Sequence, residues 1–173
     1  QQDAVGLVTF ADGIKKYLRA AAKPSQIKMI LEELRNTSPG ADTRCADTFH
    51  EIAERIPSRG LVIIISDLFD DAEAIKNALH HFRWKNHELV VFHLMAEEEI
   101  TFPFQKFDEF KCLEIAGQRV NIDPATIRAS YLERVQEHLK AMEIACGQMG
   151  ADYVPVNTKI PVEQSLYTYF TDR

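Results

Sequence analysis

Three sets of oxygen-bearing side chains follow or precede predicted elements of this sequence at places where chemistry is commonly found. Asp67 comes directly after the apolar run LVIII and Ser66, and Asp12 follows the first predicted strand. The loop Ser38-Pro39-Gly40-Ala41-Asp42-Thr43 leads into a predicted helix. Aspartate and hydroxyl oxygens from separate loops suit a hard cation such as Mg²⁺, which takes oxygen ligands and keeps several waters. The plainer interpretation is that Asp67 caps the end of a strand and Thr43 the start of a helix.

The sequence lacks the motifs of several other kinds of active or binding site. Ser66 is not in a Gly-x-Ser-x-Gly elbow, and the sequence has no Walker loop and no Gly-x-Gly-x-x-Gly. The six histidines show no metal-ligand spacing; His80 and His81 are expected to point different ways on a helix. His93 lies inside an apolar strand and is predicted to be a hydrogen-bonded sheet residue. These features argue against a serine-hydrolase nucleophile and against a dinucleotide or nucleoside-triphosphate site.

The three cysteines, Cys45, Cys112 and Cys146, are far apart and form no Cys-x-x-Cys pair. This usage favours free thiols in a reducing compartment, with neither a disulfide framework nor a zinc site. We expect a cytoplasmic location on this basis.

The element that must position Asp67 is the run LVIIIS at 61–66, which has no polar alternation. Strands with helices on both faces have this pattern. A helix with Ile75, Leu79 and Phe82 on one stripe follows, and then a second apolar strand at 88–95. This is a βαβ unit, with a right-handed crossover and a parallel pair. In such sheets ligands bind beyond the carboxyl ends of the strands.

The remaining pattern completes an α/β domain with an open, mainly parallel sheet. We predict a strand at 3–10, a turn at Asp12-Gly13 and a short edge strand IKKYL. A helix follows with Ile27, Ile30, Leu31 and Leu34 on one face, and then a second helix, ended by Pro57. The buried side of that second helix is expected to consist of Cys45, Phe49, Ile52, Ala53 and Ile56.

Toward the C-terminus, Asp123-Pro124 is predicted to start a long helix that ends at Gly150. ADYVPV is expected at a sheet edge because Pro155 cannot donate to a ladder, and a short helix at 161–170 follows. The segment from about residue 97 to about residue 122 is predicted to be an insertion. It is expected to contain Glu97-Glu98-Glu99 in a solvated loop, followed by a β-hairpin that turns at Ala116-Gly117. We expect one domain over residues 1–173.

Composition narrows the class of partner. The 173 residues carry a formal net charge of −6, with 46% apolar and 27% charged residues. An acidic chain lacks the basic footprint of a nucleic-acid or membrane-surface binder, and no apolar run approaches the roughly 20 residues of a membrane span. Because the sequence begins at Gln1 with a strand almost at once, we expect a piece of a longer protein whose upstream segments, including any membrane anchor, are not visible.

Several stretches together resemble a known family. They are DAVGLVTF, PG-x-x-T before FHEIAERI, RGLVIIISDLFDD, NHELVVFHLM, IDPATIRASYLERV and ADYVPV. The chain is similar to the von Willebrand factor A-like domain of the bacterial domain-of-unknown-function family fifty-eight. The resemblance covers nearly the whole chain and implies a three-layer fold, in which an open, mainly parallel sheet lies between two helical layers.

The resemblance also implies a divalent metal, Mg²⁺ above all, at a metal-ion-dependent adhesion site. In such domains the ligands come from an Asp-x-Ser-x-Ser motif, a threonine in a later loop and an aspartate after the fourth strand. The threonine matches Thr43 and the aspartate matches Asp67, although Thr43 is followed by Arg44 where the family often has Asp. The Asp-x-Ser-x-Ser motif does not occur in these residues and by the family pattern would lie upstream of Gln1. We expect this piece to bind metal weakly or not at all.

The same pattern implies that a central strand, between DAVGLVTF and LVIIIS, is missing from these residues. Its absence leaves two inner strands with unpaired backbone groups. We expect the chain to fill the gap by self-association, by strand exchange or by closing its sheet directly.

The resemblance implies a protein-interaction module without enzymatic activity, an adaptor or chaperone-like partner of a MoxR-type AAA+ ATPase. One alternative is a receiver-like phosphoacceptor domain with Asp67 as the acceptor, although no lysine follows NHELVVFHLM where a receiver needs one. The other is an α/β interaction domain that binds no metal.

Overall fold

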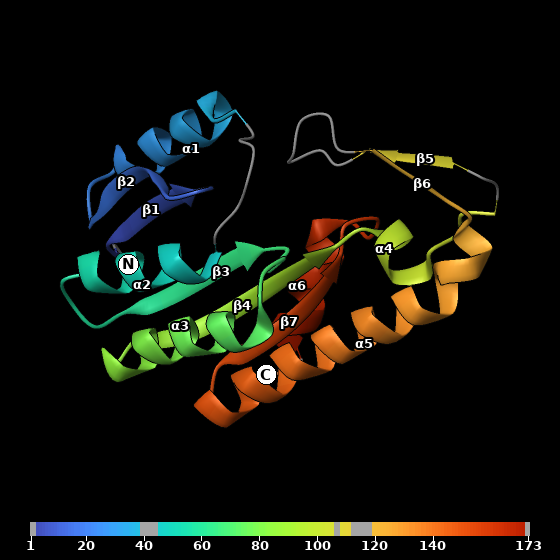
Figure 1. Cartoon of the computed structure of the whole chain (residues 1–173). Helices are drawn as coiled ribbons and strands as arrows, with labels where there is room; N and C mark the ends of the chain where they lie inside the picture. Colours follow the sequence, from blue (N-terminus) through green and yellow to red (C-terminus); the bar gives the residue numbers. More distant parts are fainter. Residues whose placement is uncertain (1–2, 39–44, 106–107, 112–118, 172–173) are drawn as a thin grey trace.

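The computed structural model describes residues 3–38, 45–105, 108–111 and 119–171, and side chains are described outside 106–122. Helices and strands alternate through most of the chain, as the sequence predicts for an α/β fold (Figure 1). The elements are β1 (Val5–Phe10), β2 (Ile14–Ala21), α1 (Gln26–Asn36), α2 (Cys45–Arg55), β3 (Leu61–Ser66), α3 (Ala72–Trp84), β4 (Glu88–Met95), α4 (Glu97–Thr101), β5 (Asp108–Lys111), β6 (Arg119–Ile122), α5 (Pro124–Met149), β7 (Asp152–Asn157) and α6 (Val162–Thr171).

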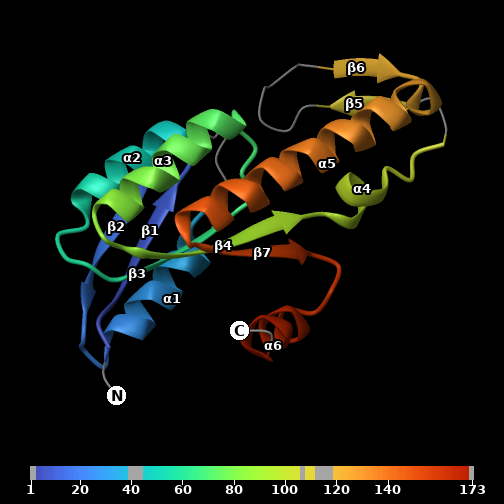
Figure 2. The ribbon, with the colours of Figure 1, turned by 90° about the horizontal axis from the view of Figure 1, so that it is seen from below.

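A three-stranded parallel sheet in the order β3-β4-β7 forms the centre of the molecule. Strand β3 pairs with β4 from Leu61 opposite Glu88 to Ser66 opposite His93. Strand β7 lies at the edge, with Pro155 exposed, as the sequence predicts. Helices flank the sheet: Figure 2 shows α2, α3 and α5 on one side of the strands and α6 on the other. The expected parallel strands therefore form, and their carboxyl ends lie along one edge.

Local signals set the ends of the helices beside this sheet. The Asp71 side chain accepts a hydrogen bond from the Ala74 N–H and caps α3. Asp123 caps α5 in the same way, with Pro124 at the first helical position. Gly150 ends α5 with φ 64°, a left-handed conformation that glycine adopts without strain. The predicted boundaries of the long helix are confirmed.

The core lies between the sheet and the layer of α2, α3 and α5. The predicted stripe of α3 is fully buried there, and the Phe49 ring of α2 lies edge-on to Phe82 of α3, with 6.4 Å between the ring centroids. The predicted buried side of α2 is confirmed from Cys45 to Ala53, and Ile56 packs against the same core. Side chains of α5 close the layer at its C-terminal half, through Met142, Ala145, Cys146 and Met149.

The hairpin β1–β2 forms a separate antiparallel sheet, connected by the turn at Asp12-Gly13. It reaches the core through α2: the Phe10 and Phe49 ring centroids are 5.3 Å apart, and the Tyr17 hydroxyl donates to the Arg55 carbonyl at 3.0 Å. Helix α1 is attached to the hairpin by Gln26, whose side-chain N–H₂ group donates to the Val5 and Arg19 carbonyls.

Most of the apolar face expected for α1 is uncovered. Ile27, Leu31 and Leu34 are exposed, Ile30 is partly buried, and Gln26 is the buried residue of this helix. The helix has the expected periodicity, but its contacts in the described structure are with β1 and β2, not with the main core. The periodicity therefore predicted the helix correctly, but it did not indicate which surface the helix packs against.

A break separates the β1–β2 hairpin from the β3-β4-β7 sheet. In the described part of the chain, β1 pairs with β2 alone and β3 pairs with β4 alone. The expectation that the sheet closes directly is therefore wrong, because β1 and β3 form no ladder. The expectation that helices cover both faces of LVIIIS is wrong as well: Leu61, Ile63 and Ile65 are 54%, 52% and 61% exposed, since no described helix packs over that face.

The predicted insertion at about 97–122 contains a helix and a hairpin. Glu97-Glu98-Glu99, expected in a solvated loop, instead begin α4, because the Glu99 side chain accepts from the Ala96 N–H at the helix start. The Glu97 carboxylate accepts a hydrogen bond from the Asn157 side chain and forms an ion pair with Lys159 at 3.6 Å. The hydrogen bond from Asn157 lowers the pKa of the Glu97 carboxyl. The antiparallel pair β5–β6 confirms the hairpin, whose predicted turn at Ala116-Gly117 lies outside the described residues.

Two neighbouring isoleucines of β3 test whether only one face of this strand is buried. Ile64 is 6% exposed and Ile63 is 52% exposed. We expect Ile64→Ala to lower the free energy of unfolding by about 2–4 kcal/mol and Ile63→Ala by less than about 1 kcal/mol, because only the first leaves a cavity. Urea denaturation at low protein concentration measures both. Equal costs would contradict the open face, since Ile63 would then be packed as tightly as Ile64.

Candidate functional site

Asp67 lies where the sequence predicts it, immediately after the last residue of β3 and exposed to solvent. LVIII is a strand, and the parallel register with β4 brings Ser66 beside His93. The carboxylate is therefore delivered to the edge of the sheet formed by the carboxyl ends of β3, β4 and β7.

The turn after β3 holds this carboxylate by an unusual backbone conformation. Leu68 has φ 48°, which is rare for a residue other than glycine, and its side chain is fully buried in the core. Such a conformation costs about 1–3 kcal/mol and persists only where the surroundings enforce it. Here the Ser66 hydroxyl accepts the Leu68 N–H at 3.1 Å, so the buried serine and the buried leucine fix the turn between them.

His93 holds the same turn from the neighbouring strand. Its Nε2 lies 2.8 Å from the Asp67 carbonyl oxygen, and its Nδ1 lies 2.8 Å from the Tyr153 hydroxyl of β7. Because a carbonyl only accepts, Nε2 carries the proton and Nδ1 accepts from the tyrosine. Burial lowers the pKa of His93 and raises that of Tyr153. The prediction of a hydrogen-bonded sheet histidine is confirmed, and its partner is the backbone of the candidate residue.

The start of α2 lies beside this turn. Cys45 Sγ is 3.8 Å from the Ser66 hydroxyl, and the Ala46 N–H donates to the Asp70 side chain at 3.2 Å. The loop that precedes α2 carries Thr43, which lies outside the described residues together with 39–42 and Arg44. Asp12, the third predicted oxygen donor, forms an ion pair with Lys15 in the hairpin turn.

The oxygen atoms near Asp67 are of the type that a hard cation binds, but they are too few to complete its coordination shell. Carboxylates of Asp67 and Asp70 and the Ser66 hydroxyl are the oxygen ligands that Mg²⁺ takes. Asp67 Oδ1 already lies 3.4 Å from the Ser66 hydroxyl and from the Phe69 N–H. In the part of the chain that the structure describes, no three His, Cys, Asp or Glu side chains are placed to hold a metal. These residues supply at most part of a coordination shell.

Phe69 is a surface feature of this turn that the sequence analysis missed. Its ring is 77% exposed, two residues after Asp67, whereas Leu68 between them is fully buried. An exposed aromatic ring beside a carboxylate is suited to contact with another protein, since aromatic side chains often anchor interfaces. The sequence signal was present in SDLFDD, where one of two adjacent apolar residues has to face outward.

A cluster of histidines on the helical layer was also missed. His50 Nδ1 of α2 lies 3.1 Å from His81 Nδ1 of α3. The other ring nitrogen of His81 lies 2.7 Å from Glu54, which also accepts from Lys85 at 2.8 Å. A spacing of four residues places His50 and Glu54 on one face of α2, and His81 and Lys85 on one face of α3. Contact between the two pairs depends on how α2 and α3 pack.

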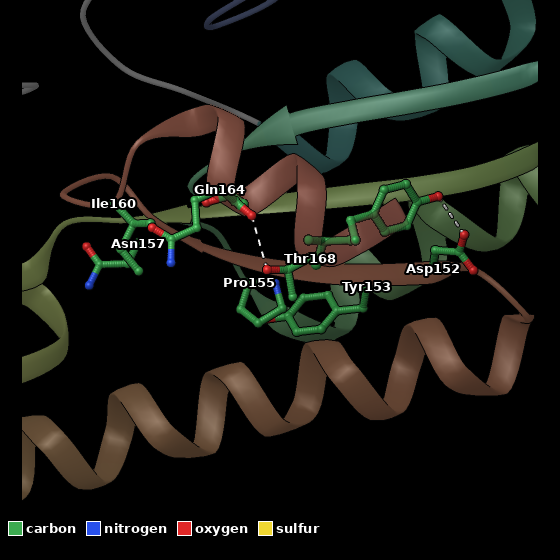
Figure 3. Close-up of a pocket in the computed structure, with 10 residues that line it drawn as sticks. Asp152, Tyr153, Pro155, Asn157, Ile160, Gln164 and Thr168 are labelled. Atoms are coloured by element: carbon green, nitrogen blue, oxygen red, sulfur yellow. Dashed lines mark hydrogen bonds between the residues drawn. The ribbon is translucent and has the colours of Figure 1, made fainter. Parts of the chain in front are cut away.

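A hollow of about 540 Å³ lies elsewhere, between β7 and α6 (Figure 3). Its lining includes Pro155 and Asn157 of the strand and Gln164 and Thr168 of the helix. Asp152 at one end accepts a hydrogen bond from the Tyr169 hydroxyl at 2.8 Å. The hollow shares no lining residue with the turn that carries Asp67.

Cys45 and Cys146 are both buried, and neither forms a disulfide bond in the part of the chain that the structure describes. Burial raises the pKa of the Cys146 thiol to about 11. Such a thiol is a packing residue and a poor nucleophile at neutral pH. Cys112 lies outside the described residues.

The buried histidine predicts a pH dependence of stability. Because the folded-state pKa of His93 lies below its ordinary value of 6.5, the unfolded chain binds the proton more readily. Stability is therefore full above pH 6.5 and falls, by up to about 1.4 kcal/mol per pH unit, as the pH drops toward the folded-state pKa. His87, also buried with a lowered pKa, acts in the same direction.

Urea denaturation between pH 7.5 and pH 5.5 measures this slope. We expect His93→Gln to be less stable at pH 7.5 and to have a shallower pH dependence than the parent chain. His80→Gln, which removes an exposed histidine, is the control and keeps the full slope. An unchanged slope in His93→Gln would show that this histidine is not held neutral by the fold.

Comparison with known proteins gives one family. The family model described as "Protein of unknown function DUF58" matches residues 1–141. Curated proteins and solved structures gave no match. In the described residues, no helix is long and apolar enough to cross a membrane.

Proposed function

This chain belongs to the DUF58 family, and on that premise we propose that it is a non-enzymatic protein-interaction module with a von Willebrand factor A-like fold. The observation that carries the proposal is the open side of β3. Three aliphatic side chains of this strand, Leu61, Ile63 and Ile65, are each more than half exposed. Aliphatic side chains gathered on one face of a strand mark a surface that another polypeptide segment covers.

The edges of the sheets support this interpretation, because only some of them are protected against pairing. The outer strand β7 carries an exposed proline, Pro155, and the outer strand β2 carries Lys15, Lys16 and Arg19. Prolines and lysines are common devices that prevent an edge from pairing. Leu61–Ser66 has no charge and no proline. The edge of β3 therefore has the composition of a strand that is paired on both sides.

Metal assistance is the second part of the proposal. Asp67 is the carboxylate that would hold Mg²⁺ at the edge of the sheet, with Thr43 as the second ligand that the family resemblance implies. A cation with an open position would accept a carboxylate from the partner, and the exposed Phe69 would supply an apolar contact beside it. The 173 residues contain no Asp-x-Ser-x-Ser motif, so they hold the cation weakly or not at all.

The partner proposed from the family resemblance is a MoxR-type AAA+ ATPase, with this chain as a cytoplasmic adaptor or chaperone-like component. A metal-free interaction domain is the alternative, and one observation favours it: no three His, Cys, Asp or Glu side chains among the described residues are placed to hold a metal. The two hypotheses differ in whether Asp67 matters for binding.

Mg²⁺ calorimetry separates them. We expect a chain that also carries the Asp-x-Ser-x-Ser motif to bind Mg²⁺, and Asp67→Ala to weaken that binding at least tenfold because it removes a carboxylate ligand. The same variant should weaken binding to a purified MoxR-type ATPase when Mg²⁺ is present. Asp71→Asn is the matched control, since asparagine also caps a helix and the nearby carboxylate is lost without disturbing α3. Equal Mg²⁺ binding by the parent and Asp67→Ala would support the metal-free alternative.

Self-association at the unpaired edge of β3, by gap filling or strand exchange, is also proposed. Light scattering after size-exclusion chromatography should show a mass that rises with concentration. We expect Ile63→Lys to abolish this rise, because a lysine would be buried in the new interface. Ile27→Lys is the control and should keep this rise, because Ile27 is also an exposed isoleucine but lies on α1, away from the edge of β3. A monomer at every concentration would contradict self-association.

A further inference from the structure

We propose that His50 and His81 form a binding site for a divalent transition-metal cation such as Ni²⁺ or Zn²⁺ on the outer surface of α2 and α3. The site shares no residue with the turn that carries Asp67, and it is independent of the function proposed above. It would take a different class of metal, because imidazole nitrogens suit zinc, copper and nickel whereas Mg²⁺ prefers oxygen ligands.

The distance between the two ring nitrogens is the first argument. His50 Nδ1 and His81 Nδ1 are 3.1 Å apart. Two nitrogens that each lie about 2.1 Å from one cation are roughly 3.0 Å apart at a right angle and roughly 3.4 Å apart at a tetrahedral angle. The observed separation lies between these values, so a cation can bind both nitrogens with little movement of either helix.

The second argument is the carboxylate behind His81. Nε2 of His81 lies 2.7 Å from a Glu54 oxygen, and the other oxygen of Glu54 accepts from Lys85 at 2.8 Å. The Glu54 carboxylate accepts hydrogen bonds, so it takes one from Lys85 and one from the Nε2–H of His81. This leaves the Nδ1 lone pair of His81 to accept the Nδ1–H of His50, and a cation that binds both Nδ1 atoms would displace that proton to Nε2 of His50. Metal-binding histidines commonly donate their second ring N–H to a carboxylate in this way.

Access and rigidity suit a surface site. His50 is exposed and His81 is partly buried, and each lies on a helix whose other face is packed in the core. Because no third His, Cys, Asp or Glu of the described residues completes the group, water or a side chain of another molecule would fill the remaining positions. A bound cation would also link α2 to α3 and stabilise their packing.

Calorimetric titration of the full chain with Ni²⁺, and separately with Zn²⁺, tests the site. We expect one saturable site, an increase in Tm with Ni²⁺, and at least a tenfold weaker affinity in both His50→Gln and His81→Gln. Glu54→Gln should weaken binding about tenfold, because it removes the carboxylate that orients His81. His80→Gln removes the adjacent exposed histidine and should bind as the parent does.

Two further measurements keep the test independent of folding defects. Circular dichroism and Tm without metal should be similar in the parent and the glutamine variants. NMR spectra of the imidazoles should show the His50 and His81 signals changing together on addition of Zn²⁺. The proposal is overturned if the parent has no saturable site, if the histidine variants bind as tightly as the parent, or if His80→Gln loses affinity to the same extent. The first result would mean that the two rings share only a hydrogen bond.

Discussion

The parallel pairing of β3 with β4 is the constraint on which the rest of this structure depends. It fixes Ser66 beside His93, and so it places the backbone of Asp67 within hydrogen-bonding distance of a histidine whose other nitrogen reaches β7. The turn after β3 can then adopt a left-handed conformation at Leu68, because the leucine side chain is fixed in the core and its N–H is bonded to Ser66. Neutral buried groups therefore position a charged group that is itself exposed.

Burial on this sheet is one-sided: one face belongs to the hydrophobic core, and the other face of β3 is an exposed apolar surface. One face of β3 and β4 is packed by α2, α3 and α5, whereas the other face of β3 exposes aliphatic side chains. The hairpin β1–β2 packs on α2 beside this strand without pairing with it. Helix α2 thus connects two sheets that share no ladder in the described part of the chain. Another segment of polypeptide would be most stabilising at the edges of β1 and β3 that face this break.

The outer surface of the same helical layer combines groups with different chemistry. Glu54 connects Lys85 and His81, and His81 meets His50 across the two helices. None of these contacts is needed for the core, which lies on the opposite side of α2 and α3. The sheet edge offers oxygen donors and the helical surface offers nitrogen donors, so the chain presents two chemically distinct surfaces on one scaffold.

The sequence by itself determined the elements and their order. Apolar runs predicted β3 and β4, caps at Asp123 and Gly150 predicted the limits of α5, and Pro155 predicted an edge strand, because each of these signals acts through the local backbone. Tertiary structure alone decided which apolar residues are covered: Ile63 is exposed and Ile64 is buried, although both belong to one uniform run. It also decided that His50 and His81, 31 residues apart, meet, and that His93 bonds to the backbone of Asp67. Those outcomes depend on how separate elements pack, and a pattern with a period of two or 3.6 residues carries no information about its neighbours across space.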